Sequence, residues 1–537
     1  MVSRDDRPPT DADVMYKVFA GEVLGADGDL DKAADEYLEA AMQSSDPEIA
    51  ERATRIALAA RAWQHVAMAS VRWVLLDPER LEAREIASRA MLLLGDYSGA
   101  EHQLGGIVDL LADDPVRAWT AVAGLLATAN DPGRADVVLT RLIEQKGAGG
   151  NADALFAQSQ FAARSGDLDR ASALIREAME LSPERAELLA WAGRVEVNRG
   201  DEARALELYQ AAHELQPTDR SIAMALAELM RRAGRTAEAQ QVLAGLRDDP
   251  GTRFSRIAFA LESGLRDLAV EIYLGFETAE YEDTVEAAFQ AAQGAELLGR
   301  VDEALEWYAR LDGTRRGLVS ALRSAYLMAD QGRLQDARNV LSRMRLRREP
   351  EVMQDSFQAE GQILLEAGAL EDAFDLLSEG LEALPDNTAL QYSRSLVAAR
   401  MERVAVAEED LRAIIAREPQ NATALNALGY TLADLTDRYG EAEGYIRAAY
   451  ELQPGEASII DSMGWVAYRL GRLEESEQYL REAWNLDQNA EIAAHLGEVL
   501  WMQDRRDEAR EAFASGLAVD AENEVLLETM DRLGVKP

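Results

Sequence analysis

The chain of 537 residues is 48% hydrophobic with only 14 prolines, which indicates a folded protein with room for several domains or one long repeat array. Its net charge of −41, from 97 acidic and 56 basic residues, argues against nucleic acid and anionic lipid as partners, because phosphate binding needs clustered Lys and Arg. The absence of cysteine excludes disulfides and thiolate chemistry, and no apolar run approaches the roughly 20 residues that span a bilayer.

The amino-terminal stretch MVSRDDRPPTDAD carries charges and prolines where an export signal has an apolar segment. The sequence as written therefore predicts no leader, and we expect residues 1–13 to form a flexible tail. The compartment stays open. The protein is periplasmic and anchored to the outer membrane if a leader is missing from this chain, and cytoplasmic if the sequence is complete.

From residue 28 onward one pattern recurs along the chain. Its clearest copies are GDLDKAADEYLEAA from Gly28, GDLDRASALIREAMELSP from Gly166, GDEARALELYQAAHELQP from Gly200, GRVDEALEWYARL from Gly299, GALEDAFDLLSEGLEALP from Gly368 and GRLEESEQYLREAWNL from Gly471. The corresponding turn positions fall near residues 28, 61, 95, 130, 166, 200, 234, 264, 299, 332, 368, 402, 437, 471 and 504, at a mean spacing of about 34 residues. This period is typical of a solenoid of paired helices.

The residue types within each copy predict how the two helices of a pair meet. The turn glycine, such as Gly471, can adopt the left-handed conformation that ends the first helix. A small residue seven positions before the turn, such as Gly464, and another five positions after it, such as Ala442, let the two helices approach closely. A large side chain nine positions past the turn, such as Leu480, fills the remaining gap, and a proline such as Pro454 stops the second helix.

On these motifs the chain resembles the tetratricopeptide-repeat family over nearly its whole length. The resemblance implies an all-α, right-handed superhelical solenoid of about 14 to 15 helix-turn-helix repeats, closed by a capping helix in the segment NEVLLETMDRL. We expect bends where the repeat loosens, near residue 148 and over 250–280. The expected parts are the tail at 1–13, an amino-terminal segment at 14–148, a middle segment at 149–250, a carboxyl-terminal segment at 251–522, and the capping helix with its tail at 523–537.

The sequence predicts no catalytic residue, no metal site and no cofactor. The four histidines, His65, His102, His213 and His495, are scattered, without a second His at ligand spacing. No glycine-rich phosphate loop is present, and neighbouring carboxylates are unavoidable among 97 acidic residues, which favours a solvated face. An enzyme is the remote alternative, and turnover by the purified protein alone would reveal it.

Aromatic residues gather on the first helices of the last repeats. Positions one and four residues past the small contact residue face the concave side of such a solenoid, and polar residues three positions before it share that face. The candidate partner-binding residues are Asn426, Tyr430, Asp461, Trp465, Tyr468 and Trp501. Large flat side chains with polar neighbours are typical of interface hot spots. The alternative is that these aromatics pack against one another and stiffen the repeats.

Two stretches resemble a narrower group. SDPEIAERATRIALAARAW (45–63) and NALGYTLADLTDRYGEAEGYIRAAYELQPGEASIIDSMGWVAYRLG (426–471), continued by AHLGEVLW (494–501), resemble the tetratricopeptide outer-membrane lipoproteins of gamma-proteobacteria. One member of that group partners a periplasmic carboxyl-terminal processing protease and presents cell-wall hydrolases to it. The resemblance implies a scaffold or adaptor with such a protease and its substrates in the concave groove. A cytoplasmic or polysaccharide-secretion scaffold is the alternative, and this chain has no lipid-accepting Cys.

Overall fold

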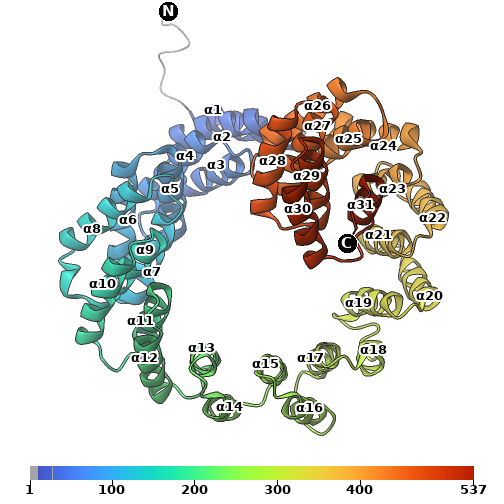
Figure 1. Ribbon diagram of the computed structural model, residues 1–537. Helices are drawn as coiled ribbons and strands as arrows, with labels where there is room; N and C mark the ends of the chain where they lie inside the picture. The colour runs from blue at the N-terminus through green and yellow to red at the C-terminus, as the bar shows by residue number, and fades with distance from the viewer. Residues whose placement is uncertain (1–9, 27, 537) are drawn as a thin grey trace, which may run out of the picture. The chain divides into compact units, whose positions relative to one another are not determined.

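The computed structural model describes residues 10–26 and 28–536, and within them it is built of α-helices, with two short 3-10 helices and no strand (Figure 1). The 31 α-helices form fifteen consecutive pairs, each an odd-numbered helix followed by an even-numbered one, and a final single helix, α31 (Glu524–Leu533). The expected all-α fold of helix-turn-helix repeats with a carboxyl-terminal capping helix is therefore confirmed. None of the described helices combines the length and apolar composition needed to cross a bilayer.

The chain divides into two compact units, and each is described by itself. Unit 1 comprises residues 1–248 and 262–265, and unit 2 comprises residues 249–261 and 266–537. The helices of unit 1 are α1 (Asp11–Ala26), α2 (Leu30–Gln43), α3 (Pro47–Ala59), α4 (Trp63–Leu76), α5 (Leu81–Leu94), α6 (Tyr97–Leu110), α7 (Pro115–Leu126), α8 (Pro132–Gln145), η1 (Ala148–Gly150), α9 (Ala152–Arg164), α10 (Leu168–Leu181), α11 (Ala186–Arg199), α12 (Glu202–Leu215), α13 (Arg220–Arg232) and α14 (Thr236–Ala244).

Unit 2 carries the second half of the repeats and the capping helix α31. Its other helices are α15 (Pro250–Glu262), α16 (Arg266–Leu274), η2 (Gly275–Glu277), α17 (Thr284–Leu297), α18 (Val301–Ala309), α19 (Gly317–Asp330), α20 (Leu334–Arg345), α21 (Pro350–Glu366), α22 (Leu370–Ala383), α23 (Thr388–Arg400), α24 (Val404–Arg417), α25 (Ala422–Leu435), α26 (Tyr439–Leu452), α27 (Ala457–Arg469), α28 (Leu473–Leu486), α29 (Ala490–Met502) and α30 (Arg506–Val519).

The first helix begins earlier than the sequence suggested. Helix α1 starts at Asp11, inside the range expected as a tail, because Thr10 and Asp13 cap it. The backbone N–H and the hydroxyl of Thr10 donate to the Asp13 carboxylate at 2.9 and 2.7 Å, which satisfies a donor that a helix start otherwise leaves open. Residues 1–9 of the expected tail lie outside the described residues.

The turns within the pairs adopt the expected left-handed backbone. At every predicted turn position except those near 130 and 437 the residue has a positive φ, for example 78° at Gly471. Three of these positions are not glycine: Arg61, Glu402 and Asp504 have φ values of 55°, 55° and 63°. The turn geometry therefore holds even where the side chain disfavours it.

The small contact residues lie where the sequence placed them. A Cβ added to Gly464 would come within 2.6 Å of the Leu480 side chain, and one added to Gly497 within 2.3 Å of Phe513. Any larger residue at these positions would push the two helices of the pair apart. The close approach of the paired helices is confirmed.

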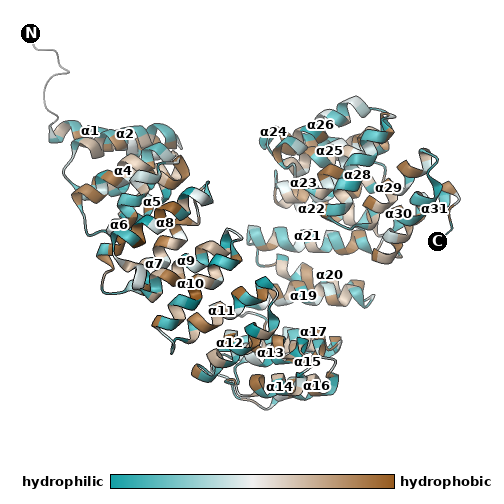
Figure 2. Ribbon diagram, turned by 60° about the vertical axis from the view of Figure 1, so that its left-hand side comes forward, coloured by the Kyte–Doolittle hydropathy of each residue, from teal (hydrophilic) through white to brown (hydrophobic). Residues whose placement is uncertain are grey.

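The core is a series of small clusters along the repeats. One cluster in unit 1 is centred on Leu104, Trp119 and Leu139, and one in unit 2 on Leu428 and Ile446. Apolar and polar residues therefore share most helices in Figure 2, since each helix buries one side against its neighbours and exposes another. Such a core is typical of a repeat protein in which each repeat contacts mainly its neighbours.

The carboxyl-terminal repeats of unit 2 curl tightly. The Arg400 guanidinium at the end of α23 lies 2.6 Å from the Glu524 carboxylate at the start of α31, although 124 residues separate them. Closer along the chain, the Tyr430 hydroxyl of α25 donates to the Glu491 carboxylate of α29 at 3.0 Å. The inner side of α25, α27 and α29 is therefore narrow.

Candidate functional site

The odd-numbered helices of unit 2 carry the candidate residues on one side. Gly429, Gly464 and Gly497 turn their open Cα positions toward the paired even-numbered helix, where Ile446, Leu480 and Phe513 lie against them. Residues one and four positions later project from other sides of the same helices, because successive helical residues are rotated by about 100°. Tyr430, Trp465, Tyr468 and Trp501 occupy such positions.

Helices α25, α27 and α29 bring five side chains together in what we call the His495 cluster: Tyr430, Asp461, Trp465, Glu491 and His495. The Trp465 and His495 rings stack with centroids 4.3 Å apart and planes 23° from parallel. Nδ1 of His495 lies 3.0 Å from both oxygens of Asp461. The Tyr430 hydroxyl donates to Glu491 at 3.0 Å and lies 3.5 Å from Nε2 of His495.

The surrounding acids hold a positive charge on the buried imidazole. Burial by itself would lower the pKa of His495, but the carboxylate of Asp461, with further contributions from Glu491 and Asp434, raises that pKa to about 9. His495 is therefore an imidazolium at neutral pH, and its two donors face Asp461 and the Tyr430 oxygen. Burial and the nearby acids hold the pKa of Tyr430 well above its ordinary value, so this hydroxyl stays protonated.

The candidate residues differ in how much solvent they meet. Trp465 is 7% exposed and Asp461 is 6% exposed, because the His495 cluster encloses both. Asn426, Tyr430, Tyr468 and Trp501 are partly buried. The structure thus brings Tyr430, Asp461 and Trp465 into one packed group, where the sequence analysis expected an open strip.

The remaining candidates lie at the margin of this group. The Tyr468 ring lies 5.2 Å from the Trp465 ring, and its hydroxyl donates to Glu498 at 2.9 Å. The Arg506 guanidinium lies 3.8 Å above the Trp501 ring. The side-chain oxygen of Asn426 is buried and accepts no hydrogen bond from the described residues.

Sequence reasoning missed His495, the centre of the cluster. It lies one repeat after Asp461, at 34 residues' distance, and two positions before the contact glycine Gly497. The sequence does contain a signal for this contact, because an Asp and a His one repeat apart lie on the same side of adjacent odd-numbered helices. Aligning the repeats reveals that pairing, whereas the spacing of residues within a single helix does not.

A second group, which we call the amide pocket, lies on α21, α23 and α25 and extends to the end of α24. It encloses about 440 Å³ and is lined by Gln354, Gln358, Asn387, Thr388, Ala389, Tyr392, Ile414, Glu418, Asn421, Thr423 and Ala424. Glu418 is the only ionisable carboxylate in this lining, and it accepts from Thr388 at 2.5 Å and from Asn421 at 2.8 Å. In a chain of net charge −41, this pocket is therefore mostly neutral and rich in hydrogen-bonding groups.

The amide pocket was also absent from the sequence analysis, although the repeat register points to it. Gln358 lies three positions before the contact residue Gly361, the same offset as Asn426 before Gly429. Applying that offset to the repeats that precede the aromatic residues would have found it.

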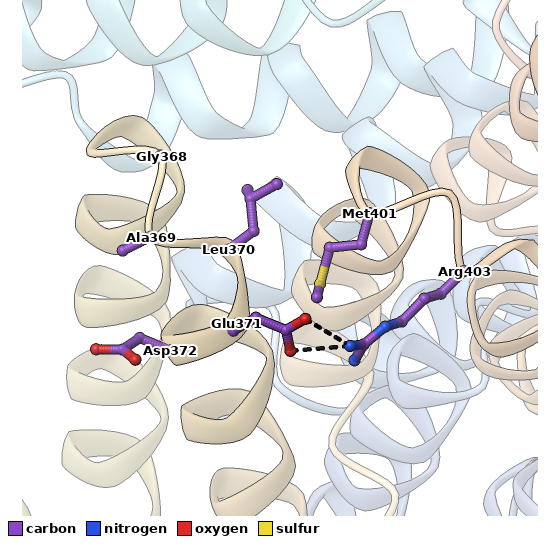
Figure 3. Close-up of a pocket in the computed structure, with 7 residues that line it drawn as sticks. All are labelled: Gly368, Ala369, Leu370, Glu371, Asp372, Met401 and Arg403. Carbon is purple, nitrogen blue, oxygen red and sulfur yellow. Dashed lines mark hydrogen bonds and ion pairs between the residues drawn. The ribbon is translucent and has the colours of Figure 1, made fainter.

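A third site, an open depression, has a different character. Figure 3 shows it between the turn at Gly368–Asp372 and the turn that carries Met401 and Arg403, with a volume of about 570 Å³. The Arg403 guanidinium contacts both Glu371 oxygens at 2.7 and 2.8 Å, as the dashed lines in Figure 3 mark. Because these charges neutralise each other, the depression offers a ligand little beyond an open surface.

Known proteins share the repeat. Family models described as tetratricopeptide repeat match residues 156–220, 196–258 and 392–457. The TPR repeat-containing protein PA4667 of Pseudomonas aeruginosa is 34% identical over 495 residues, which cover 90% of this chain and 82% of that protein.

Solved structures with a similar course include a Naa15/Naa10 complex bound to HypK-THB, at 13% identity and a TM-score of 0.37, covering 98% of this chain and 94% of that one. A thermophilic TPR protein of Thermus thermophilus, TTC0263, matches at 22% identity and a TM-score of 0.31 over 34% of this chain and 97% of its own. The repeat motifs, the paired helices and the similarity to the Pseudomonas protein over most of both lengths together show that this chain belongs to the family of tetratricopeptide-repeat proteins.

Proposed function

We propose that the protein is a non-catalytic adaptor that holds a protein client along the odd-numbered helices of unit 2. The amide pocket is the observation that carries this proposal. Side-chain amides offer both N–H donors and C=O acceptors, the two groups that a polypeptide backbone must satisfy when it leaves water. The oxygens of Asn387 and Asn421 already accept from the first turns of α23 and α25, so the Gln354 and Gln358 amides are the groups that we expect to meet a client. A lining with a single carboxylate, Glu418, which already accepts from Thr388 and Asn421, favours an extended backbone over an acidic side chain, because it offers amide and hydroxyl partners and no cation.

The client's path continues from the amide pocket toward Asn426 and the partly buried Tyr430. The buried oxygen of Asn426 accepts no hydrogen bond from the described residues, and we propose that a client N–H supplies the missing donor. Trp465 and Asp461 support this surface from beneath, because 7% and 6% exposure leave them little area for direct contact. Tyr468 and Trp501 form the outer edge of the proposed surface.

The more specific role that we propose is presentation of cell-wall hydrolases to a carboxyl-terminal processing protease. Its support is the similarity of residues 45–63, 426–471 and 494–501 to the outer-membrane lipoproteins, one member of which acts in this way. In such a complex the protease supplies the catalytic groups, and the adaptor supplies binding and orientation.

The experiment combines this protein, a carboxyl-terminal processing protease from the same organism and a folded cell-wall hydrolase. We expect the cleavage rate to rise at least tenfold when the wild-type protein is present, and the protein alone to cleave nothing. Replacing Gln358 and Thr423 by Ala removes amide and hydroxyl partners from the amide pocket and is expected to weaken client binding at least fivefold in a fluorescence titration.

A matched control is Gln335→Ala on α20, an exposed glutamine outside the pocket that hydrogen-bonds Asn339. It should leave client affinity unchanged. A wild-type protein that binds the hydrolase without accelerating the protease would remove the presentation role and keep the adaptor. Equal affinity of both glutamine variants would remove the amide pocket from the proposed surface.

A further inference from the structure

The amino-terminal helix α1 exposes an apolar face, which we call the α1 face. Met15, Tyr16, Phe19 and Val23 are 64%, 71%, 68% and 45% exposed. At the helical period these four side chains lie together, with Ala12 and Ala26 on the same side. Soluble proteins rarely leave contiguous apolar patches of more than a few hundred Å² uncovered without an interaction to use them.

The repeat itself shows what such a face is for. The contact residue of α1 is Gly21, which meets Tyr37 of the paired helix. Tyr16 lies five positions before Gly21, Phe19 two positions before it, and Val23 two positions after it. The equivalent positions of α27 are Ile459, Ser462 and Val466, exposed by only 2%, 3% and 1%. On α29 they are Ile492, His495 and Val499, exposed by 4%, 2% and 0%.

Inside the array these positions are covered by the preceding repeat, and at the other end of the chain α31 buries Leu526 and Met530 against the last one. Among the described residues no helix precedes α1. The positions that a neighbouring helix covers in other repeats are therefore exposed on the α1 face.

The charges around the α1 face indicate the kind of helix that fits. Asp11 and Glu22 border it on one side, where Glu22 is paired with the Arg52 guanidinium of α3 at 3.0 Å, and Asp13 borders it on the other. Lys17, the one basic residue of α1, turns away toward Glu36 and Glu39 of α2. Residues 11–43 hold nine acidic residues against two lysines.

We propose that the α1 face docks an amphipathic helix of another protein whose apolar stripe is flanked by Lys or Arg. The apolar stripe takes the place that a preceding repeat occupies on α27 and α29, and the basic flanks meet the acidic borders, which also disfavours a second copy of this acidic chain. This surface belongs to unit 1 and is independent of the client surface proposed for unit 2.

The test uses a synthetic helix of about 20 residues with Leu along one stripe and Lys on both flanks, labelled for fluorescence anisotropy. A twin peptide carries Glu in place of Lys, and a scrambled peptide keeps the composition without the stripe. We expect micromolar binding of the basic helix to the full chain, and at least tenfold weaker binding of both other peptides.

Two protein variants separate docking on the α1 face from general attraction to an acidic protein. The double variant Tyr16→Ser with Phe19→Ser should weaken binding of the basic helix at least tenfold. It should leave the melting temperature of the protein unchanged, because both side chains are exposed. Leu75→Ser on α4, which removes an apolar side chain of 67% exposure elsewhere in unit 1, should leave binding unchanged. Equal binding by the two variants overturns the proposal.

Other occupants have their own signatures. A wild-type dimer in light scattering that Phe19→Ser converts to a monomer assigns the face to a second copy and overturns the proposal. A tenfold gain in helix affinity after deletion of residues 1–9 assigns it to the chain's own first residues and also overturns the proposal. A monomer whose affinity does not change on that deletion supports it.

Discussion

Several charged side chains of unit 2 are buried at helix positions where the repeat pattern alone does not predict a charge. His495 is 2% exposed and stands between the acids of three helices: Asp434 on α25, Asp461 on α27 and Glu491 on α29. A buried charge is tolerated only when partners satisfy it, and here the partners come from successive repeats. The residue therefore joins three repeats through electrostatics rather than through apolar contact.

The raised pKa of His495 predicts a stability that depends on pH. A group whose pKa rises from 6.5 to about 9 on folding contributes its stabilisation fully below pH 6.5 and loses it as the pH rises through 9. Between pH 6.5 and 10 we expect the wild type to lose up to about 3 kcal/mol more than His495→Gln. Denaturant unfolding across this range measures the difference.

The control for this prediction is Gln335→Ala on α20, which removes an exposed side chain that carries no ionisable group. Its stability profile should run parallel to the wild type. If the unfolding free energy of His495→Gln also changes with pH in parallel with the wild type, the imidazole has the same pKa in the folded and unfolded chains.

At the scale of helices, the residue that follows each turn distinguishes the two units. In unit 1 it is often Asp, as at Asp167 and Asp201, whose side chains accept from the backbone of their own helix. In unit 2 it is usually Arg. Arg438 lies 2.7 Å from Glu441 of its own helix and 2.7 Å from Glu408 of the preceding repeat.

The arginine pattern accounts for part of the excess of Arg over Lys in this chain, 52 residues against four. The Arg438 and Arg412 guanidinium groups hold the pKa of Glu408 at about 2. Arg472 and Glu443, at 2.9 Å, repeat the arrangement one repeat later. A planar guanidinium can serve two carboxylates at once, which an ammonium group does less well, and this favours Arg over Lys at such positions.

The capping helix α31 provides a test at this scale. Its Arg532 guanidinium contacts both oxygens of Glu498 at 2.8 and 2.6 Å, and the Glu498 side chain is only 3% exposed. Arg532→Ala leaves a buried carboxylate with Tyr468 as its remaining partner, and we expect a loss of about 3 kcal/mol in the unfolding of the last repeats.

The double variant Arg532→Ala with Glu498→Gln should recover more than half of that loss, because it removes the uncompensated charge. Chemical denaturation followed by hydrogen exchange of α29 and α31 measures both effects. A single variant as stable as the wild type would mean that water satisfies Glu498.

For the whole molecule, the division into two units and the series of small cores predict that damage stays local. Neighbouring repeats share contacts, whereas distant ones share few, so stability is close to a sum over repeats and their interfaces. The units meet in sequence near α14 and α16, each only nine residues long and therefore poor in buried side chains.

Gly464→Leu tests this behaviour. The new side chain would overlap Leu480, and we expect a cost of roughly 1–3 kcal/mol confined to the repeats around α27. Limited proteolysis should open α25–α31 while unit 1 stays protected. Gly444→Leu, on α26 with open space around it, should leave the pattern unchanged. Simultaneous cleavage of both units would contradict a repeat-by-repeat architecture.

The sequence by itself determined the repeat register, the turns, the contact glycines and the final cap. These features depend on residues within one repeat of each other, so the period exposes them, as Gly464, Gly471 and Leu480 illustrate. It also determined which side of each odd-numbered helix carries the aromatic residues, because that side follows from the helical period alone.

Only the tertiary structure decided which of these helix sides are buried by neighbouring side chains and which remain accessible to a partner. The tight curl of the last repeats sets Tyr430 against Glu491, 61 residues away, and buries Trp465 and His495, while the amide pocket earlier in unit 2 stays accessible. The curl results from small rotations added over several helix interfaces. No single motif encodes such a sum, so the sequence predicts the repeat and not the surface that the repeats build.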